Sequence, residues 1–348
     1  MNQNEYGVSV EKWGSVDGIP VQRFVLQSGK LCAAVLSYGA TLQMLEYNGQ
    51  DRILGYDSLE GYLGGGSYQG AAVGRYANRI AGGKFTLNGR ICDVGRNEKG
   101  IGHLHGGEVG FDKRLWTAEI VDDGEEPAVR FSLLAADGEE GYPGNLSVSL
   151  TYRVVGGDTL RLTYTAESDQ DTVVNLTNHA YFNLNGREES DILNTRVRIA
   201  AEYITPVDAR LIPTGEFLPV EGTPFDFREE KAIGQDIGAP DEQLRLGLGY
   251  DHNFVLGPDR RRRHAVSAWS PESGVRMDCY TDLPGVQFYT ANMLGEPGGK
   301  GGWPLRKNQG FCLETQFFPD SPNQPSFPSP VLRAGERYES TTEYRFSR

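Results

Sequence analysis

The stretch LSVSLTYRVVGGDTLRLTYTA, residues 146–166, carries the clearest structural pattern in the sequence. Apolar side chains occupy every second position on both sides of a Gly-Gly-Asp turn: Leu146, Val148, Leu150, Tyr152 and Val154 before it, and Leu160, Leu162, Tyr164 and Ala166 after it. Successive side chains of a strand point to opposite faces, so this alternation predicts a long antiparallel hairpin with one buried face.

Shorter strands are predicted on the N-terminal side of this hairpin. Residues 21–27, 31–38 and 42–47 form three β-prone runs separated by turn residues. In residues 84–91, KFTLNGRI, the Asn88-Gly89 dipeptide lies between apolar alternations. This dipeptide favours a type I′ hairpin turn, because both central residues of that turn need positive φ. We therefore expect a succession of antiparallel hairpins.

Helical periodicity is rare in the chain. Residues 58–62 support at most one turn, and residues 232–237 are too few and contain a glycine. The 45 glycines and 18 prolines are scattered over the whole length, as is typical of folds with many short strands and tight turns. We find no repeat and no linker-like change in composition. The sequence predicts an all-β protein with minor helix, folded as one domain over residues 1–348.

The charge of the chain excludes some classes of partner. Lys+Arg number 34 against 47 Asp+Glu, a net charge of −13, and such an acidic surface repels nucleic acid. We find no apolar run long enough for a signal peptide or a membrane span, so no membrane association is expected. The four cysteines, at positions 32, 92, 279 and 312, form no CxxC pair. This spacing favours free thiols and a cytoplasmic location.

Residues 175–185, NLTNHAYFNLN, are the first candidate for a functional segment. In a strand, His179, Tyr181 and Asn183 would project from one face, and the apolar residues between them would pack on the other. The chain has only five histidines, and most of them lie in polar segments with aromatic or glycine neighbours. This grouping predicts a site in which histidine takes part in the chemistry.

A metal site is one alternative for these histidines. His103 and His105 lie two residues apart, and Glu108 with the distant His179 would complete a cupin-like ligand set. Such sites usually have three or four residues between the second histidine and the carboxylate, whereas here two glycines intervene, so we predict no metal. The glycines at 64–66 lack the Lys-Ser/Thr of a phosphate loop, and the chain has no G-x-S-x-G element of a hydrolase.

Acid–base chemistry by a histidine and a carboxylate remains, in a cleft of aromatic and amide side chains suited to sugars. The candidate carboxylates are Asp251, Asp282, Glu314 and Asp320. Glu314 stands out because it follows the apolar run Phe-Cys-Leu, where burial would raise its pKa toward a value useful for a general base. A purely structural carboxylate, bound to backbone amides or an arginine, is the alternative at each position.

The chain resembles the aldose 1-epimerase, or galactose mutarotase, family over nearly its full length. Seven segments carry the resemblance in the same order: GRYANRI (74–80) with GGKFTLNG, LHGG (104–107) with GFDKRLW, DGEEGYPGNLSVSLTY (137–152), NLTNHAYFNL (175–184), YDHNFVL (250–256), GVQFYT (285–290) and LETQFFPDSPNQPSFP (313–328). One such segment is weak evidence, but seven in order are specific.

The resemblance implies a galactose mutarotase-like supersandwich, a β-sandwich of large, curved antiparallel sheets with the sugar in an open cleft on one face. It also implies an isomerase that interconverts the α and β anomers of aldohexoses such as D-galactose and D-glucose, with a monosaccharide substrate, no cofactor and no metal. The alternatives are a hexose-6-phosphate 1-epimerase and a non-catalytic sugar-binding protein of the same fold. Monomer and homodimer both stay open.

The resemblance also assigns roles to residues by their place in these segments. It implies that His179 is the general acid and Glu314 the general base, and that the sugar is bound by Asn78, Arg79, His105, Tyr181, Asp251 and Gln287. Arg75 is the alternative sugar-facing arginine, because strand alternation puts it on the same face as Arg79; a buried ion pair is its structural alternative. Both catalytic pKa values are expected near neutrality, His179 unaided and Glu314 after an upward shift. Tyr76 replaces a smaller aliphatic residue common in the family and is expected at the edge of the pocket.

Overall fold

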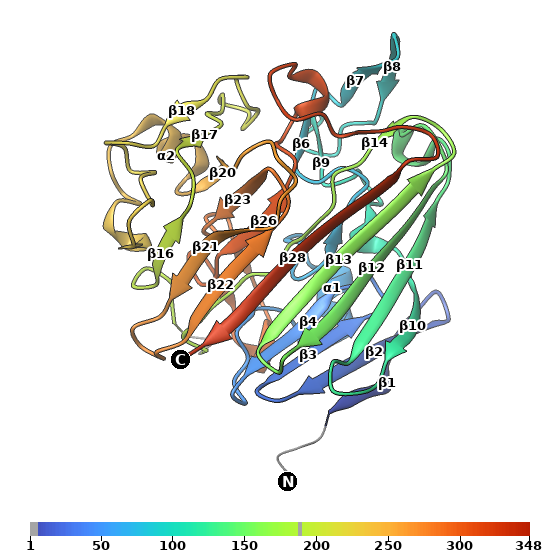
Figure 1. Cartoon of the computed structure of the whole chain (residues 1–348), viewed down its shortest axis with the longest axis vertical. Coiled ribbons are helices and arrows are strands. Elements are labelled where there is room, and N and C mark those ends of the chain that lie inside the picture. The colour runs from blue at the N-terminus through green and yellow to red at the C-terminus, as the bar shows by residue number, and fades with distance from the viewer. Residues whose placement is uncertain (1–5, 187–189) are drawn as a thin grey trace.

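A nine-stranded antiparallel sheet is the larger layer of the computed structural model, which describes residues 6–186 and 190–348 (Figure 1). The predicted hairpin lies within it as β12 (Leu146–Val155) and β13 (Thr159–Ser168), with Leu150 opposite Tyr164. Buried side chains alternate with less buried ones along both strands, which confirms the prediction. The other strands are β10 (Thr117–Asp122) and β11 (Ala128–Ala135) on one side, and β28 (Arg337–Ser347), β22 (Arg276–Thr281), β21 (Arg263–Trp269), β16 (Arg196–Ile199) and β19 (Lys231–Ala232) on the other.

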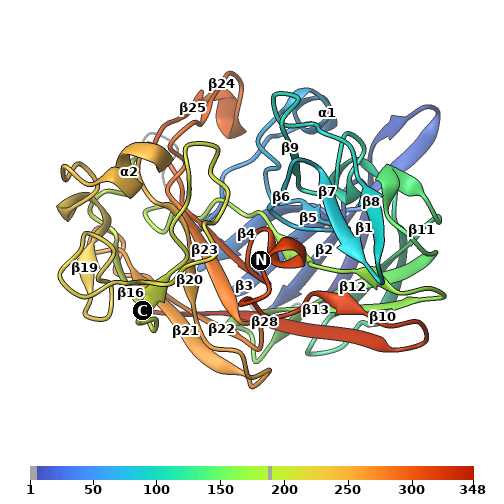
Figure 2. The ribbon, with the colours of Figure 1, turned by 90° about the horizontal axis from the view of Figure 1, so that it is seen from above.

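Two smaller antiparallel sheets form the second layer. One consists of β1 (Gly7–Val16), β2 (Ile19–Ser28), β3 (Leu31–Leu36) and β4 (Leu42–Tyr47). The other has the order β18 (Leu218–Pro219), β17 (Tyr203–Ile204), β20 (Asp251–Val255), β23 (Gly285–Tyr289) and β26 (Cys312–Gln316). In Figure 2, β3, β4, β20 and β23 lie on one side of the layer that contains β21, β22 and β28. The three predicted early strands and the β-sandwich are therefore confirmed.

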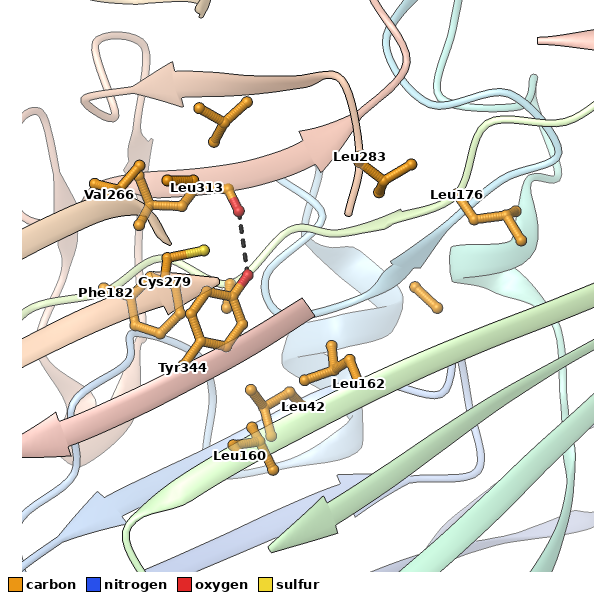
Figure 3. Packing of buried hydrophobic residues seen from close by; sticks show 14 of the residues in the cluster. Leu42, Leu160, Leu162, Leu176, Phe182, Val266, Cys279, Leu283, Leu313 and Tyr344 are labelled. Atoms are coloured by element: carbon orange, nitrogen blue, oxygen red, sulfur yellow. Dashed lines mark hydrogen bonds between the residues drawn. The ribbon is translucent and has the colours of Figure 1, made fainter. Parts of the chain in front are cut away.

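The core lies between these layers. The Tyr344 ring on β28 packs against Phe182, with 4.9 Å between ring centroids, and its hydroxyl donates to the Leu313 carbonyl on β26 (Figure 3). Leu42 of β4 and Leu162 of β13 belong to the same cluster. Burial of this apolar area holds the layers together. The Tyr344 contact also fixes β26, the strand that carries Glu314, to the large sheet.

Five two-stranded ladders lie outside these three sheets. They pair β5 (Ala72–Val73) with β15 (Thr177–Asn178), β6 (Arg79–Ala81) with β9 (Gly102–Leu104), β7 (Lys84–Leu87) with β8 (Arg90–Asp93), β14 (Thr172–Val173) with β27 (Val331–Leu332), and β24 (Gly295–Glu296) with β25 (Leu305–Arg306). In the β7–β8 turn Asn88 and Gly89 have φ of 51° and 77°. Positive φ at both positions confirms the predicted hairpin.

Helix is a minor component, as predicted. The described residues form two α-helices, α1 (Leu59–Gly64) and α2 (Glu242–Gly247), and five 3₁₀ turns: Phe111–Lys113, Glu139–Gly141, Ile233–Gln235, Lys300–Gly302 and Ser321–Asn323. The side chain of Asp241 caps α2 by accepting bonds from the backbone of Gln243 and Leu244. In the part of the chain that the structure describes, none of the helices is both long and apolar enough to span a membrane.

Residues 175–185 differ from the prediction of one regular strand. Only Thr177 and Asn178 belong to a ladder, and the chain then bonds to three different partners. The amides of His179, Phe182 and Asn183 donate to the carbonyls of Ala71, Phe311 and Arg52 respectively. The segment crosses between sheets, so no single neighbour can pair with all of it. The apolar half of the expected alternation holds, because Ala180, Phe182 and Leu184 lie in the core, whereas the Asn183 amide donates to the carbonyls of Ser190 and Gln309.

Candidate active site

A cavity of about 370 Å³ lies where β20, β23 and β26 meet the β6–β9 ladder. It brings together most of the residues that the sequence singled out, which come from distant parts of the chain. The polar and aromatic side chains that line it are Ser67, Asn78, Arg79, Glu98, His105, His179, Asp251, Glu296, Glu314, Tyr68, Tyr181 and Tyr289. Such a mixture of rings and hydrogen-bonding groups suits a sugar-sized ligand.

Sheet register positions the two carboxylates at the base of the cavity. Asp251 on β20 and Glu314 on β26 both flank β23, where they pair with Tyr289 and Gln287. Because β23 is hydrogen-bonded on both sides, neither carboxylate can slide along the sheet without breaking a ladder. The register therefore sets the separation of the two carboxylates.

His179 and Glu314 form the central pair of the site. His179 Nε2 lies 3.7 Å from Glu314 Oε1, and the two residues are 5% and 2% exposed. Glu314 Oε2 has no hydrogen-bond partner among the described residues, and Glu314 lines the cavity. A buried carboxylate oxygen without a partner is costly, so burial favours the neutral form of Glu314.

Burial shifts the two pKa values in opposite directions. Desolvation lowers the pKa of His179 to about 4, which differs from the expected unaided value near neutrality. Desolvation and the nearby Asp251 raise the pKa of Glu314 well above its ordinary value, in the expected direction, while Arg79 opposes the rise. Burial thus disfavours both the imidazolium form of His179 and the carboxylate form of Glu314. At pH values between the two pKa values, the pair holds one titratable proton.

Aromatic rings and a thiol fix the orientation of His179. Its ring packs against Tyr181 and His105, with centroids 5.0 Å and 5.3 Å away, and stacks on Tyr68 at 5.8 Å. The sulfur of Cys312 lies 3.5 Å from Nδ1. With Nδ1 against the thiol, Nε2 is the nitrogen directed toward Glu314. The geometry therefore presents one nitrogen of His179 to a ligand.

His105 presents a hydrogen-bond donor to the same cavity. The backbone N–H of Asn78 donates to His105 Nδ1 at 3.1 Å. In the neutral ring an accepting Nδ1 leaves the proton on Nε2. Burial keeps this ring neutral, because desolvation lowers its pKa well below the usual value. Ligand atoms of His105, His179 and Glu314 lie within 4.8 Å of one another, but a protonated Nε2 donates hydrogen bonds and does not coordinate a cation.

The structure distinguishes the two candidate arginines. Arg79 lines the cavity, whereas the Arg75 guanidinium donates to the carbonyls of Pro143 and Gly144 and lies outside the cavity lining. Strand alternation suggested one face for both, but Asn78 has a φ of 63° and interrupts the extended backbone. Among the described residues Arg75 has no carboxylate partner, so a buried ion pair, its other predicted role, is not formed either.

Three other predicted positions differ from simple expectation. Gln287 does not line the cavity; its amide donates to Asp251 Oδ1 at 2.7 Å, so it holds the carboxylate. Tyr76 is fully buried and donates to the Phe318 carbonyl, so it is not at the pocket edge. His103 contacts the hydroxyl of Tyr142 and does not share the cavity with His105.

The remaining carboxylate candidates are structural. Asp320 accepts hydrogen bonds from the backbone of Ala81 and the amide of Asn323, and Asp282 pairs with Arg260. Among the polar and aromatic lining residues, sequence reasoning missed Ser67, Tyr68, Glu98, Tyr289 and Glu296. Tyr289 lies in the GVQFYT segment and Glu98 precedes LHGG by a few residues, so proximity to these segments was the available signal.

Comparison with known proteins gives consistent matches over nearly the whole chain. A family model described as aldose 1-epimerase matches residues 22–345. Galactose mutarotase from Bos taurus is 45% identical over 333 residues, which cover 94% of each chain. Aldose 1-epimerase from Escherichia coli K12 is 38% identical over 339 residues, 95% of this chain and 96% of the other. Galactose 1-epimerase from Lactobacillus acidophilus NCFM has a similar structure, with a TM-score of 0.88, 28% identity and 99% of each chain covered.

Proposed function

The chain belongs to the aldose 1-epimerase family, and we propose that it interconverts the α and β anomers of aldohexoses such as D-galactose and D-glucose, with His179 as general acid and Glu314 as general base. The activity is that of an aldose 1-epimerase, an isomerase acting on a sugar. The observation that carries the residue assignment is the buried His179–Glu314 pair, 3.7 Å apart in a cavity.

The reaction needs two groups of this kind close together. Opening a cyclic hemiacetal removes the proton from the C1 hydroxyl and delivers one to the ring oxygen. Both oxygens are bonded to C1, so the acid and the base must lie within a few ångströms of each other, as His179 and Glu314 do. Rotation about C1–C2 then exposes the other face of the aldehyde, and ring closure reverses both transfers. Each group contributes about 10²–10⁴-fold to such a reaction.

The shared proton makes the pair competent in both directions. Because burial opposes charge on either group, one proton resides on the pair, and each turnover needs one donor and one acceptor. The lowered pKa of His179 and the raised pKa of Glu314 place this proton on Glu314 in the empty site, and the positive charge of Arg79 opposes that placement by lowering the pKa of Glu314. The reactive form in this proposal is the one with the proton on His179, in which His179 donates to the ring oxygen while Glu314 accepts from the C1 hydroxyl. Reclosure returns the proton to the starting arrangement.

The remaining polar side chains supply the sugar contacts in this proposal. Asn78, Arg79 and His105 offer hydrogen-bond donors to the sugar. Asp251 accepts hydrogen bonds from sugar hydroxyls, and the Gln287 amide holds its Oδ1. Tyr181 gives a ring face beside the acid. The cavity also favours an uncharged sugar over a phosphorylated one. Four carboxylates line it, those of Glu98, Asp251, Glu296 and Glu314, and Arg79 is the one cation among the described lining residues.

The purified chain is expected to accelerate the optical-rotation change of freshly dissolved α-D-galactose or α-D-glucose above the rate in buffer, measured by polarimetry. The 6-phosphate of α-D-glucose is expected to react with a kcat/KM at least about 10-fold lower, because like charges repel in the cavity. A sugar that binds without acceleration would favour the non-catalytic alternative. Faster reaction of the 6-phosphate than of glucose would favour the phosphate-specific alternative.

The dependence of kcat/KM on pH is expected to be a broad bell, measured by polarimetry with buffer-catalysed rates subtracted. The active form is the pair with one proton. Activity should fall at low pH, as a second proton binds with a pKa near the lowered value of His179, about 4. It should also fall at high pH, as the last proton leaves with the raised pKa of Glu314. A profile of kcat/KM with only one titration step, centred on the ordinary histidine pKa, would contradict the proposal that the two residues share one proton.

We also propose that residues 1–348 work as one catalytic domain, since the family model spans nearly all of the chain. A cytoplasmic location and a monomeric or homodimeric state complete the proposal. All four cysteines are free thiols, as expected of a reducing compartment.

A further inference from the structure

Arg79 is held by a carboxylate that the catalytic scheme does not use. Glu98 accepts from Arg79 Nε at 3.1 Å and 2.9 Å with its two oxygens, and from Nη2 at 2.8 Å. The two side chains are 7% and 21% exposed. This fork geometry is the most directional form of an ion pair. It occupies one edge of the guanidinium.

The opposite edge of the guanidinium remains available. Nη1 of Arg79 makes no hydrogen bond within the described residues, and Arg79 lines the cavity. Burial lowers the pKa of Arg79, but the Glu98 bonds and the charges of Asp251 and Glu314 outweigh that effect, so the group stays charged. Arg79 therefore has three carboxylates within electrostatic reach, and only Glu98 is paired with it. An Arg79 released from Glu98 would be drawn toward the other two.

Hydrogen bonds in the loop before β9 fix the position of Glu98 beside Arg79. The backbone amide of Glu98 donates to the Gly102 carbonyl, which closes a tight loop ahead of β9. Beside it, the Asn97 amide donates to the carbonyls of Leu104 and Gly107, and its oxygen accepts from the Leu104 amide. Leu104 lies opposite Arg79 in the β6–β9 register. The ladder that places Arg79 thus also places its partner.

We propose that Glu98 is a positioning residue of the isomerase: it holds the Arg79 guanidinium so that Nη1 faces the sugar hydroxyls and its charge stays away from Glu314. This inference rests on the proposed function. Glu98 also adds one of the four carboxylates that disfavour phosphorylated sugars. It acts through Arg79 and takes no part in proton transfer.

The test compares Glu98→Ala and Glu98→Gln with the wild-type protein by polarimetry on α-D-galactose. Glu98→Ala is expected to raise KM about 10-fold, because Arg79 is no longer held toward the sugar. Both limbs of the pH profile should move to lower pH, since a negative charge is lost and Arg79 is left unneutralised beside Glu314. Glu98→Gln keeps the shape and one acceptor oxygen. It should show the same pH shift with a smaller rise in KM.

Glu108→Gln is the matched control. Glu108 is an exposed carboxylate in a neighbouring loop and lies outside the cavity lining. Its replacement by glutamine removes the same charge as Glu98→Gln without affecting the contacts of Arg79. Its KM and pH profile should equal those of the wild type. Unchanged values in both Glu98 variants would overturn the inference, as would a raised KM without a pH shift. If Glu98→Ala does not fold, Glu98→Gln decides. An inactive wild type would instead count against the proposed function.

Discussion

Replacement of Glu314 by glutamine is expected to lower kcat for anomer interconversion by about 10²–10⁴-fold. The amide has nearly the shape of the carboxylate but cannot accept the C1 hydroxyl proton. The side chain is buried and one of its oxygens has no partner among the described residues, so the fold does not depend on its charge. Replacing a buried ionisable side chain by a neutral amide of the same shape should leave stability unchanged or higher.

Polarimetry on α-D-galactose and thermal unfolding measure the two parts of this expectation. Glu296→Gln serves as the control, because Glu296 lines the same cavity but contacts Tyr56, away from the pair. Its kcat should stay within a few-fold of the wild type. A Glu314→Gln variant that keeps wild-type kcat would remove Glu314 from the mechanism. If Glu314→Gln does not fold, its loss of activity comes from unfolding and not from the loss of a general base.

Replacement of His179 by asparagine is expected to reduce kcat by about 10²–10⁴-fold while the protein still binds sugar. Asparagine does not protonate, so it has no proton to give to the ring oxygen. The proposed sugar-binding groups Asn78, Arg79, His105 and Asp251 all remain. Ground-state affinity should therefore change by only a few-fold. The effect falls on the transition state, where proton transfer occurs.

Calorimetric titration with D-galactose and polarimetry separate binding from turnover in this variant. His264→Asn is a suitable control, because His264 on β21 contacts Ser267 and Asp278 and takes no part in the cavity. It should keep normal kcat and affinity. A His179→Asn variant with wild-type turnover would exclude His179 as the acid. Loss of both turnover and binding would contradict the separation of the two roles.

Local sequence patterns predicted the parts of the fold that depend on neighbouring residues. The alternation in residues 146–166 predicted β12 and β13, and Asn88-Gly89 predicted the β7–β8 turn. Both signals are local because strand faces alternate with period two and the turn requires positive φ at given positions. The same alternation placed His179 and Tyr181 on the cavity side. It did not reveal that residues 175–185 bond to three separate partners.

The candidate site was predicted in part. The ordered segments of the family resemblance named His179 and Glu314, and the structure brings them into one cavity. They did not separate Arg75 from Arg79, because the positive φ at Asn78 is not visible in strand alternation. They also placed Gln287 with the sugar, whereas it contacts Asp251.

By itself, therefore, the sequence determined the all-β class, the main hairpins and the residue types of the site, since these follow from short-range alternation, turn chemistry and ordered segments. Only the tertiary structure decided the 3.7 Å approach of His179 to Glu314, the opposite shifts of their pKa values and the pairing of Arg79 with Glu98. Distance and desolvation depend on how separate strands register and pack. Those relations join residues far apart in the chain, and no local pattern encodes them.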